Sequence, residues 1–265
     1  MEIDKKNLNN IVYSTIRNIY AIWLREIKVF LREKSRLVAS LFTPLLWLFI
    51  IGSGLGPSTN VSMDGEFNYQ MFIFPGIVCM AIIFTSVFYG AYIIWDRKFD
   101  FLKSVMVTPV SRDIIFIGKT IGGMTNSMIQ VMVLLFIGFL IGIDYTALSL
   151  IQILCIAILL SFLLTALGLG LGSYMYSLEG FQMIVSFVVF PLFFLSGALF
   201  PLENLPQWLY ALTNADPATY AVDALRISML GTGNFIFEYD LLILFGFTVA
   251  FGLFGIYSFR RMKAV

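Results

Sequence analysis

The residues best suited to chemistry gather in one charged stretch, Trp95–Lys119, which lies between two long apolar segments. Its first part shows a short helical pattern that mixes charged and apolar side chains: Asp96, Arg97, Lys98, Phe99, Asp100, Phe101, Leu102 and Lys103. Pro109 has no backbone amide and disfavours helix in the residue before it, so this helix is predicted to end near Val107. Ser111 is a suitable cap for the next helix. Two interpretations stay open: a helix that docks a cytosolic partner, and a solvated connecting loop.

The residue types give little support for metal binding, disulfide formation or nucleotide binding by this chain. Histidine is absent, which removes the common imidazole–metal and haem sites. Cys79 and Cys155 each stand alone inside apolar runs, where packing explains them better than a disulfide or a metal site. Gly118-Lys119-Thr120 resembles the end of a phosphate-binding loop, but Asp113 stands where such a loop opens with glycine. The sequence therefore predicts no catalytic residue, no metal site and no cofactor bound by this chain.

The composition is that of a protein embedded in a membrane. Of the 265 residues, 59% are hydrophobic and 12% are charged, whereas soluble domains carry about 25% charged residues. Several apolar stretches reach the roughly 20 residues that a helix needs to cross the hydrocarbon layer. Because barrel strands would instead alternate over about 10 residues, the long runs predict an all-α integral membrane protein.

The basic residues mark one side of that membrane. Of the 17 Lys and Arg residues, eight lie at Lys5–Arg36, five at Arg97–Lys119 and three at Arg260–Lys263. Since Lys and Arg collect in cytoplasmic loops, both termini and the stretch Trp95–Lys119 are expected in the cytosol. The sequence thus predicts a multi-pass protein of the cell (plasma) membrane with both termini cytoplasmic.

Hydrophobic runs and their breaks divide the chain into three parts. Residues 1–36 form a cytosolic N-terminus, in which Val12–Arg32 has the spacing of an interfacial amphipathic helix. Residues 37–259 hold six predicted transmembrane helices, and residues 260–265 form a cytosolic tail. The predicted spans are Leu37–Leu55, Met71–Trp95, Ile114–Ile143, Ala147–Tyr176, Phe181–Phe200 and Leu241–Phe259.

The segment between the fifth and sixth spans is neither a span nor a simple loop. Leu205–Leu212 is a short apolar helix, and Asp216-Pro217 and Gly231 are the start and stop signals of another. Both helices are too short to cross a membrane, so residues 202–231 are predicted to form an outer re-entrant helical hairpin. Within the second helix, Asp223 and Arg226 are three residues apart and are expected to pair.

The spans themselves lack the residues that power transport. At lipid depth none of the six carries Asp, Glu, Lys, Arg or His, and Lys119 is expected near the interface. Ion-coupled pumps keep such residues in the membrane because they carry the coupling. Glycines in the third and fourth spans, such as Gly122 and Gly168, are expected to let helices of this chain approach closely. What remains is a pathway that needs energy from a cytosolic partner.

Two motifs carry a family resemblance. The first comprises Asp96-Arg97, Phe99, Phe101-Leu102-Lys103, Val107, Pro109-Val110-Ser111-Arg112 and Gly118-Lys119. The second is FPLFFLSGALFPLENLP, Phe190–Pro206, continued by PATYAVDALR, Pro217–Arg226. In this order they resemble the signature of the type-2 permease family of ATP-binding-cassette transporters, in particular daunorubicin-type drug exporters and nodulation-factor exporters. Asp100 stands where these relatives usually have Gly, and Ser104 stands where an acidic residue is common.

The resemblance implies the membrane subunit of an ATP-driven exporter. Residues 96–107 would be the cytosolic coupling helix, seated in a cleft of a separate ATPase subunit present in two copies, and the Val12–Arg32 helix would lean on that subunit. A second copy of this chain would complete the translocation path, as a homodimer in the lipid bilayer. ATP and Mg would bind to the partner subunit, no nucleic acid would be involved, and the cargo would be an amphiphilic drug, lipid, glycolipid or polysaccharide.

The resemblance also assigns roles to particular residues. Those expected to couple to the ATPase are Asp96, Arg97, Lys98, Phe99, Asp100, Phe101, Leu102, Lys103, Pro109, Ser111 and Arg112. Those expected at the outward gate and substrate path are Phe193, Phe194, Leu195, Ser196, Gly197, Phe200, Pro201, Leu205 and Pro206. Two other functions compete: a non-transporting membrane anchor or scaffold that recruits a cytosolic protein, and an intramembrane enzyme, for which no cluster of nucleophiles or acid–base groups is visible.

Overall fold

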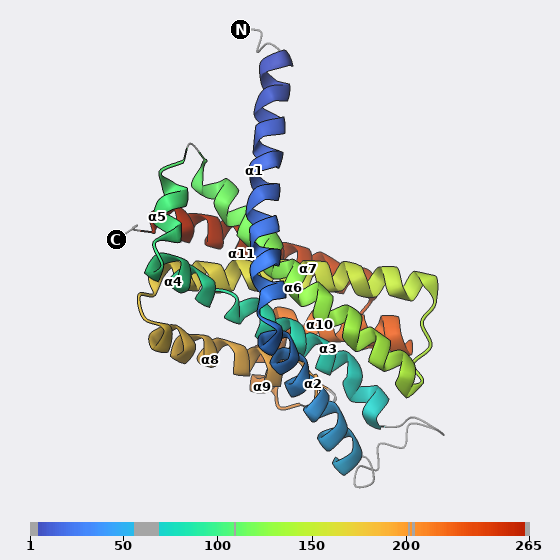
Figure 1. The fold of residues 1–265 in the computed structure, drawn as a ribbon. Helices are drawn as coiled ribbons and strands as arrows, with labels where there is room; N and C mark the ends of the chain where they lie inside the picture. The colour runs from blue at the N-terminus through green and yellow to red at the C-terminus, as the bar shows by residue number, and fades with distance from the viewer. Residues whose placement is uncertain (1–4, 56–68, 109, 201, 203–204, 263–265) are drawn as a thin grey trace.

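The computed structural model describes residues 5–55, 69–108, 110–200, 202 and 205–262, and all regular structure within these ranges is helical. The helices, coloured from blue to red along the chain in Figure 1, are α1 (Lys5–Arg32), α2 (Lys34–Leu55), α3 (Tyr69–Phe88), α4 (Ala91–Lys98), α5 (Phe101–Met106), α6 (Arg112–Ile141), α7 (Ala147–Tyr174), α8 (Leu178–Leu195), α9 (Gln207–Asn214), α10 (Pro217–Leu230) and α11 (Phe237–Arg261). Pro109 and Pro201, predicted as a coupling and a gate residue, lie outside the described residues.

Five stretches are long and apolar enough to cross a membrane: Tyr69–Lys98, Arg112–Ile141, Ala147–Tyr174, Leu178–Leu195 and Phe237–Arg261. The prediction of an all-α, multi-pass membrane protein is confirmed. Helix α2 contributes a shorter apolar stretch, Val38–Gly52, so the first of the six predicted spans stays a prediction. The fifth span ends at Leu195 instead of Phe200, because Gly197 turns the chain with a positive φ of 71°.

Helix α7 is central to the packing and contacts α3, α4, α6, α10 and α11. Glycine makes the closest of these approaches possible. A Cβ atom on Gly90 would overlap the carbonyl oxygen of Gly168, and a Cβ on Gly168 would overlap that of Val87. Gly122 of α6 meets Glu26 of α1 in a similar way. The close approaches at Gly122 and Gly168 are the packing within the chain that was expected of them, and Gly90 adds one that was not predicted.

Helix α1 crosses the other helices, and its N-terminal half extends beyond the bundle in Figure 1. One face packs on α6, where Ile22 meets Gly118. Large apolar side chains on its remaining surface are exposed, among them Tyr13, Ile16 and Tyr20. A helix thus covers Val12–Arg32 as expected, while its amphipathic role in a membrane interface stays a prediction.

The helix predicted over residues 96–107 is two helices in the structure. Helix α4 ends at Lys98, and α5 begins at Phe101, directly after Asp100, whose backbone is left-handed with φ of 56°. A left-handed backbone costs ordinary residues roughly 1–2 kcal/mol and is easiest for glycine. This geometry explains physically why glycine would suit position 100 in the family pattern.

Several chain segments meet at one end of the bundle, shared by α4, α5, the start of α6, the end of α11 and the connection from α7 to α8 (Figure 1). Arg97 joins α4 to the end of α7 by donating to the carbonyl oxygens of Ser173 and Met175. Arg112 joins α6 to the end of α11 by donating to the carbonyl oxygen of Met262. We call this end the basic end, after its exposed cations Lys98, Lys103, Arg112, Arg260 and Arg261.

The segment α9–α10 follows the predicted caps. Asp216 accepts a hydrogen bond from the amide of Ala218 at 2.8 Å, and Gly231 ends α10 with φ of 71°. Helix α10 is almost wholly buried against α3, α7, α8 and α11. Its polar backbone is thus covered by protein, which a re-entrant segment requires, but its entry into a membrane stays a prediction.

The predicted pairing of Asp223 with Arg226 is wrong. Asp223 accepts hydrogen bonds from the backbone amides of Asn234 at 2.9 Å and Phe235 at 2.8 Å. Arg226 instead donates to the carbonyl oxygen of Gly197 at 3.0 Å. Among the described side chains these two form no ion pair with each other, because folding supplies each with a partner from a distant turn.

Candidate functional site

Four charged side chains gather beneath α5 and are called the charge cluster: Arg25, Glu26, Asp96 and Lys119. The Lys119 ammonium lies 2.9 Å from Glu26 and is also paired with Asp96. The Arg25 guanidinium lies 2.7 Å from a carboxylate oxygen of Glu26 and 2.7 Å from one of Asp96. The cluster joins three helices, since its members come from α1, α4 and α6.

The charges in this cluster balance, two cations against two carboxylates, which allows them to be buried. Lys119 is 0% exposed, and an unpaired charge at such a place would cost several kcal/mol. Burial alone would raise the pKa of Glu26, but Lys119, Arg25 and a hydrogen bond from the Tyr89 hydroxyl lower that pKa to about 2. Glu26 is therefore ionised at neutral pH.

The first turn of α5 rests on the charge cluster. The Arg25 guanidinium carbon lies 3.8 Å from the centroid of the Phe101 ring, a close cation–π contact. The next side chain, Leu102, is fully buried in a hydrophobic group with Tyr89 and Ile115. Helix α5 is thus in contact, through Phe101 and Leu102, with the helices that carry the charge cluster.

The residues predicted to couple to an ATPase fall into two groups. Asp96, Arg97 and Leu102 are buried, and the first two are held by contacts within the chain. The exposed members are Lys98, Phe99, Asp100, Lys103, Ser111 and Arg112, and Phe101 is half-buried. Ser111 caps α6 as predicted, because its hydroxyl accepts a hydrogen bond from the amide of Ile114. The role of the whole set in coupling stays a prediction.

The predicted gate residues form a packed turn after α8. Phe193 is buried and meets Trp47 of α2 edge to face, with ring centroids 5.7 Å apart, whereas Phe194 is exposed. The Ser196 hydroxyl donates to the carbonyl oxygen of Phe193 at 2.7 Å, and Gly197 provides the turn. Leu195, Phe200 and Leu205 are half-buried, and Pro206 is exposed just before α9. Gating by this segment stays a prediction.

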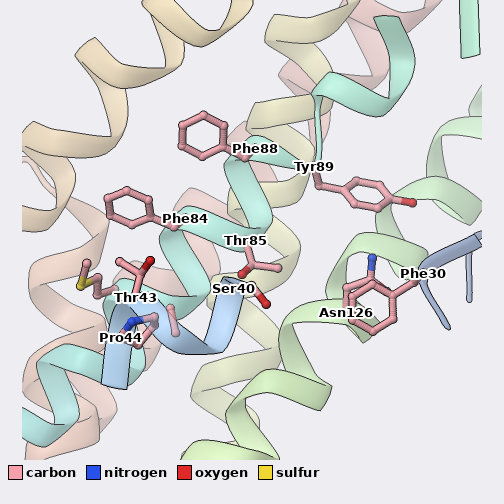
Figure 2. Close-up of a pocket in the computed structure, with 11 residues that line it drawn as sticks. Phe30, Ser40, Thr43, Pro44, Phe84, Thr85, Phe88, Tyr89 and Asn126 are labelled. Atoms are coloured by element: carbon pink, nitrogen blue, oxygen red, sulfur yellow. The ribbon is translucent and has the colours of Figure 1, made fainter. Parts of the chain in front are cut away.

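A cavity of about 270 Å³ lies between α1, α2, α3 and α6. Figure 2 shows Phe84, Phe88 and Pro44 on one side of it and Asn126 beside Phe30 on the other. The side-chain oxygen of Asn126 is buried and has no hydrogen-bond partner. Mostly apolar walls with a few polar side chains are typical of a site for a small amphiphile.

Sequence reasoning missed Arg25, Glu26 and Lys119 as members of one site. A signal was present for Glu26, which lies four residues before Phe30 and seven after Ile19, on the apolar face of its helix. A carboxylate on a packing face needs a cation from a neighbouring element. Local spacing gives no indication that this cation is Lys119, which lies 93 residues further along the chain.

Comparison with known proteins agrees with these features. Residues 17–230 match the family described as ABC-2 type transporter. The chain is 28% identical over 245 residues to the inner membrane transport permease YadH of Escherichia coli, covering 88% of this chain and 91% of that protein. It is 25% identical over 227 residues to nodulation protein J of Neorhizobium galegae, covering 82% and 83% of the two chains. The match includes α3 to α10 whole, with both motifs that carried the resemblance, and the chain belongs to the ABC-2 type transporter family.

Proposed function

We propose that this chain is the membrane-spanning permease subunit of an ATP-driven exporter and that it has no ATPase activity of its own. Two copies of a separate ATP-binding-cassette ATPase dock at the basic end and carry the ATP and Mg. Both termini and the basic end face the cytosol, since basic residues mark the cytoplasmic side. Family membership and the names of its relatives as transport permeases support this function.

One observation supports the proposal most directly: one side of α5 packs against the rest of the chain, and apolar residues at its two ends are exposed. Leu102 is 0% exposed and Phe101 lies on the charge cluster, while Phe99 is 69% exposed and Val107 is 87% exposed. Phe99 and Val107 flank α5, and large exposed apolar side chains beside a packed helix are typical of a docking surface. A solvated connecting loop would need neither the packing of Phe101 and Leu102 nor the exposed apolar side chains.

We further propose that the chain acts as a homodimer with α8 beside the path. Helix α8 leaves Gln182, Met183 and Phe187 exposed along one face. An amide facing lipid lacks hydrogen-bond partners, which is costly in hydrocarbon. Contact with water or with a second copy of this chain would relieve that cost.

The cargo is proposed to be amphiphilic. The cavity supports this class, because aromatic side chains line it together with the polar side chains of Thr43, Thr85 and Asn126. The scaffold alternative would also use the docking surface but would need no such cavity.

The test uses the chain reconstituted in liposomes with its co-expressed ATPase. Val107→Asp should abolish ATPase binding and the change in hydrolysis rate that the permease causes. Leu148→Asp is the control, since Leu148 is similarly exposed at the start of α7, away from the basic end. ATP-dependent movement of a fluorescent amphiphile is expected. ATPase binding without any movement would favour the scaffold, and binding untouched by Val107→Asp would refute the docking surface.

A further inference from the structure

Arg97 is a buried cation whose charge is not matched by an acidic partner. Its side chain is 8% exposed and donates only to backbone, to Met175 at 2.8 Å and Ser173 at 3.1 Å. Its Nε is buried without a partner, and Arg97 forms no ion pair with any carboxylate in the described part of the chain. The cations of the charge cluster, by contrast, each contact two carboxylates. A buried charge of this kind favours an anion from outside.

Arg97 lines a cleft of about 510 Å³ at the basic end, between α4 and the connection from α7 to α8. Lys98 adds a second cation and Ser177 adds a hydroxyl. The aromatic rings of Trp95 and Tyr176 complete its rim, as is common where a protein meets the headgroup layer of a membrane.

The cleft continues into an apolar groove. Glu179 lines both the cleft and an open groove of about 780 Å³ along α8, whose walls include Met183, Phe187 and Phe190. Because α8 is one of the five candidate spans, the groove runs along a membrane-spanning surface. A polar, cationic end joined to an apolar channel matches a molecule with an anionic head and a hydrocarbon tail.

We propose that this cleft and groove bind a lipid with a phosphate headgroup from the leaflet at the basic end. The Arg97 guanidinium group, the Lys98 ammonium and the Ser177 hydroxyl hold the phosphate, and the acyl chain lies against Met183 and Phe187. Glu179 opposes the anion and limits the affinity. The inference deepens the proposed export function and rests on it for the cargo's movement, yet binding itself needs no ATPase.

The experiment measures which lipids stay bound to the full-length chain by native mass spectrometry. The protein is taken from bilayers of phosphatidylcholine alone or mixed with phosphatidylglycerol. We expect phosphatidylglycerol to be retained preferentially. Lys98→Gln should weaken retention roughly fivefold, the ratio that about 1 kcal/mol gives for an exposed charge contact, and Glu179→Gln should strengthen it. Neither variant removes a hydrogen bond described within the chain, so both are expected to fold. Arg97→Gln, by contrast, would remove the hydrogen bonds from Arg97 to Ser173 and Met175.

Two matched controls complete the design. Lys28→Gln removes an exposed cation from α1, and Phe245→Ser removes an exposed aromatic from α11; neither should change retention. Phe187→Ser, in the groove, should weaken it. Equal retention of both lipids, or Lys98→Gln and Glu179→Gln acting in the same direction, would overturn the proposal.

A further arm separates a lipid headgroup from free phosphate. The cleft would be a site for a soluble anion if inorganic phosphate displaced phosphatidylglycerol and Phe187→Ser had no effect on retention. That result would overturn the lipid proposal. If Lys98→Gln lost ATPase binding but retained lipid unchanged, the cleft would be part of the ATPase-binding surface. The lipid proposal would then be wrong as well. Failure of the transport test leaves the binding result standing, so the two hypotheses fail separately.

Discussion

Replacing Lys119 by methionine should destabilise the protein strongly, although the two side chains are similar in length. Lys119 is fully buried and contacts Glu26 and Asp96, so Lys119→Met leaves two carboxylates beside the single cation Arg25. Removing one partner of a buried ion pair costs about 3–5 kcal/mol. At roughly 2–4 °C per kcal/mol for a chain of this size, the unfolding temperature should fall by about 10 °C.

A second substitution turns this loss into a test of the charge cluster itself. Glu26→Gln alone should also destabilise, because it leaves two cations with one carboxylate. The double variant Lys119→Met with Glu26→Gln restores balance, one cation with one carboxylate. Its loss should therefore be smaller than the sum of the single losses by about 1–3 kcal/mol.

The assay is thermal unfolding of the four purified proteins in one detergent, followed by tryptophan fluorescence. The control is Lys28→Met, which replaces an exposed lysine on the same helix as Glu26 and should change the unfolding temperature little. Losses that add within about 0.5 kcal/mol would mean that α1 and α6 are not coupled through these charges, and the reasoning would be refuted.

The pH dependence of the charge cluster has a definite sign. The pKa of Glu26 is about 2 in the folded chain, below its ordinary value of 4.5. The stabilisation from Glu26 is therefore complete above pH 4.5 and is lost as the pH falls toward 2. Variation between pH 6 and pH 8 must come from other groups.

Three further outcomes follow from single positions. Asp100→Gly should raise stability by about 1 kcal/mol, because glycine accepts the left-handed backbone at φ of 56° without strain; a lower unfolding temperature would contradict this. Gly90→Ala should cost about 1–3 kcal/mol by overlap with the Gly168 backbone, whereas Gly246→Ala, with open space around it, should cost nothing by unfolding temperature. Burial raises the pKa of Asp216 to about 8, against a hydrogen bond from Ala218 that lowers it, so stability should fall by about 2 kcal/mol between pH 6 and pH 8. Asp216→Asn keeps the cap and should remove that slope in thermal scans; an unchanged slope would place its origin elsewhere.

The features predicted well from sequence are those set by neighbouring residues. Ser111, Asp216 and Gly231 each begin or end a helix where their types predict it, because a cap acts on amides or carbonyls within one turn. The membrane class followed equally directly from the length of the apolar runs. Such signals depend on a few consecutive residues and need no knowledge of the fold.

The candidate site was predicted in part, because its charges are satisfied across the fold. Asp96 and Arg97 belong to the charged stretch as predicted, but local spacing could not show that both are buried. Asp96 pairs with cations on α1 and α6, and Arg97 donates to carbonyl oxygens at the end of α7. From sequence alone, a charged residue between two spans is therefore interpreted as exposed to solvent, because its partners in the folded chain are not known.

The break at Asp100 links these observations to the proposed function. Helix α5 is separated from α4 by Phe99 and Asp100, and the backbone of Asp100 is left-handed, so α4 does not hold α5 as a continuous helix would. Its side chains also pack on the rest of the chain, Phe101 on Arg25 and both Leu102 and Val105 in the hydrophobic group described above. A force applied to α5 by a docked ATPase would therefore reach α1 and α6 through the charge cluster as well as α4 directly. Under this mechanism, Glu26→Gln should reduce the permease's effect on ATP hydrolysis at a temperature where the variant is still folded and still binds the ATPase. Normal stimulation under those conditions would show that the charge cluster serves stability alone.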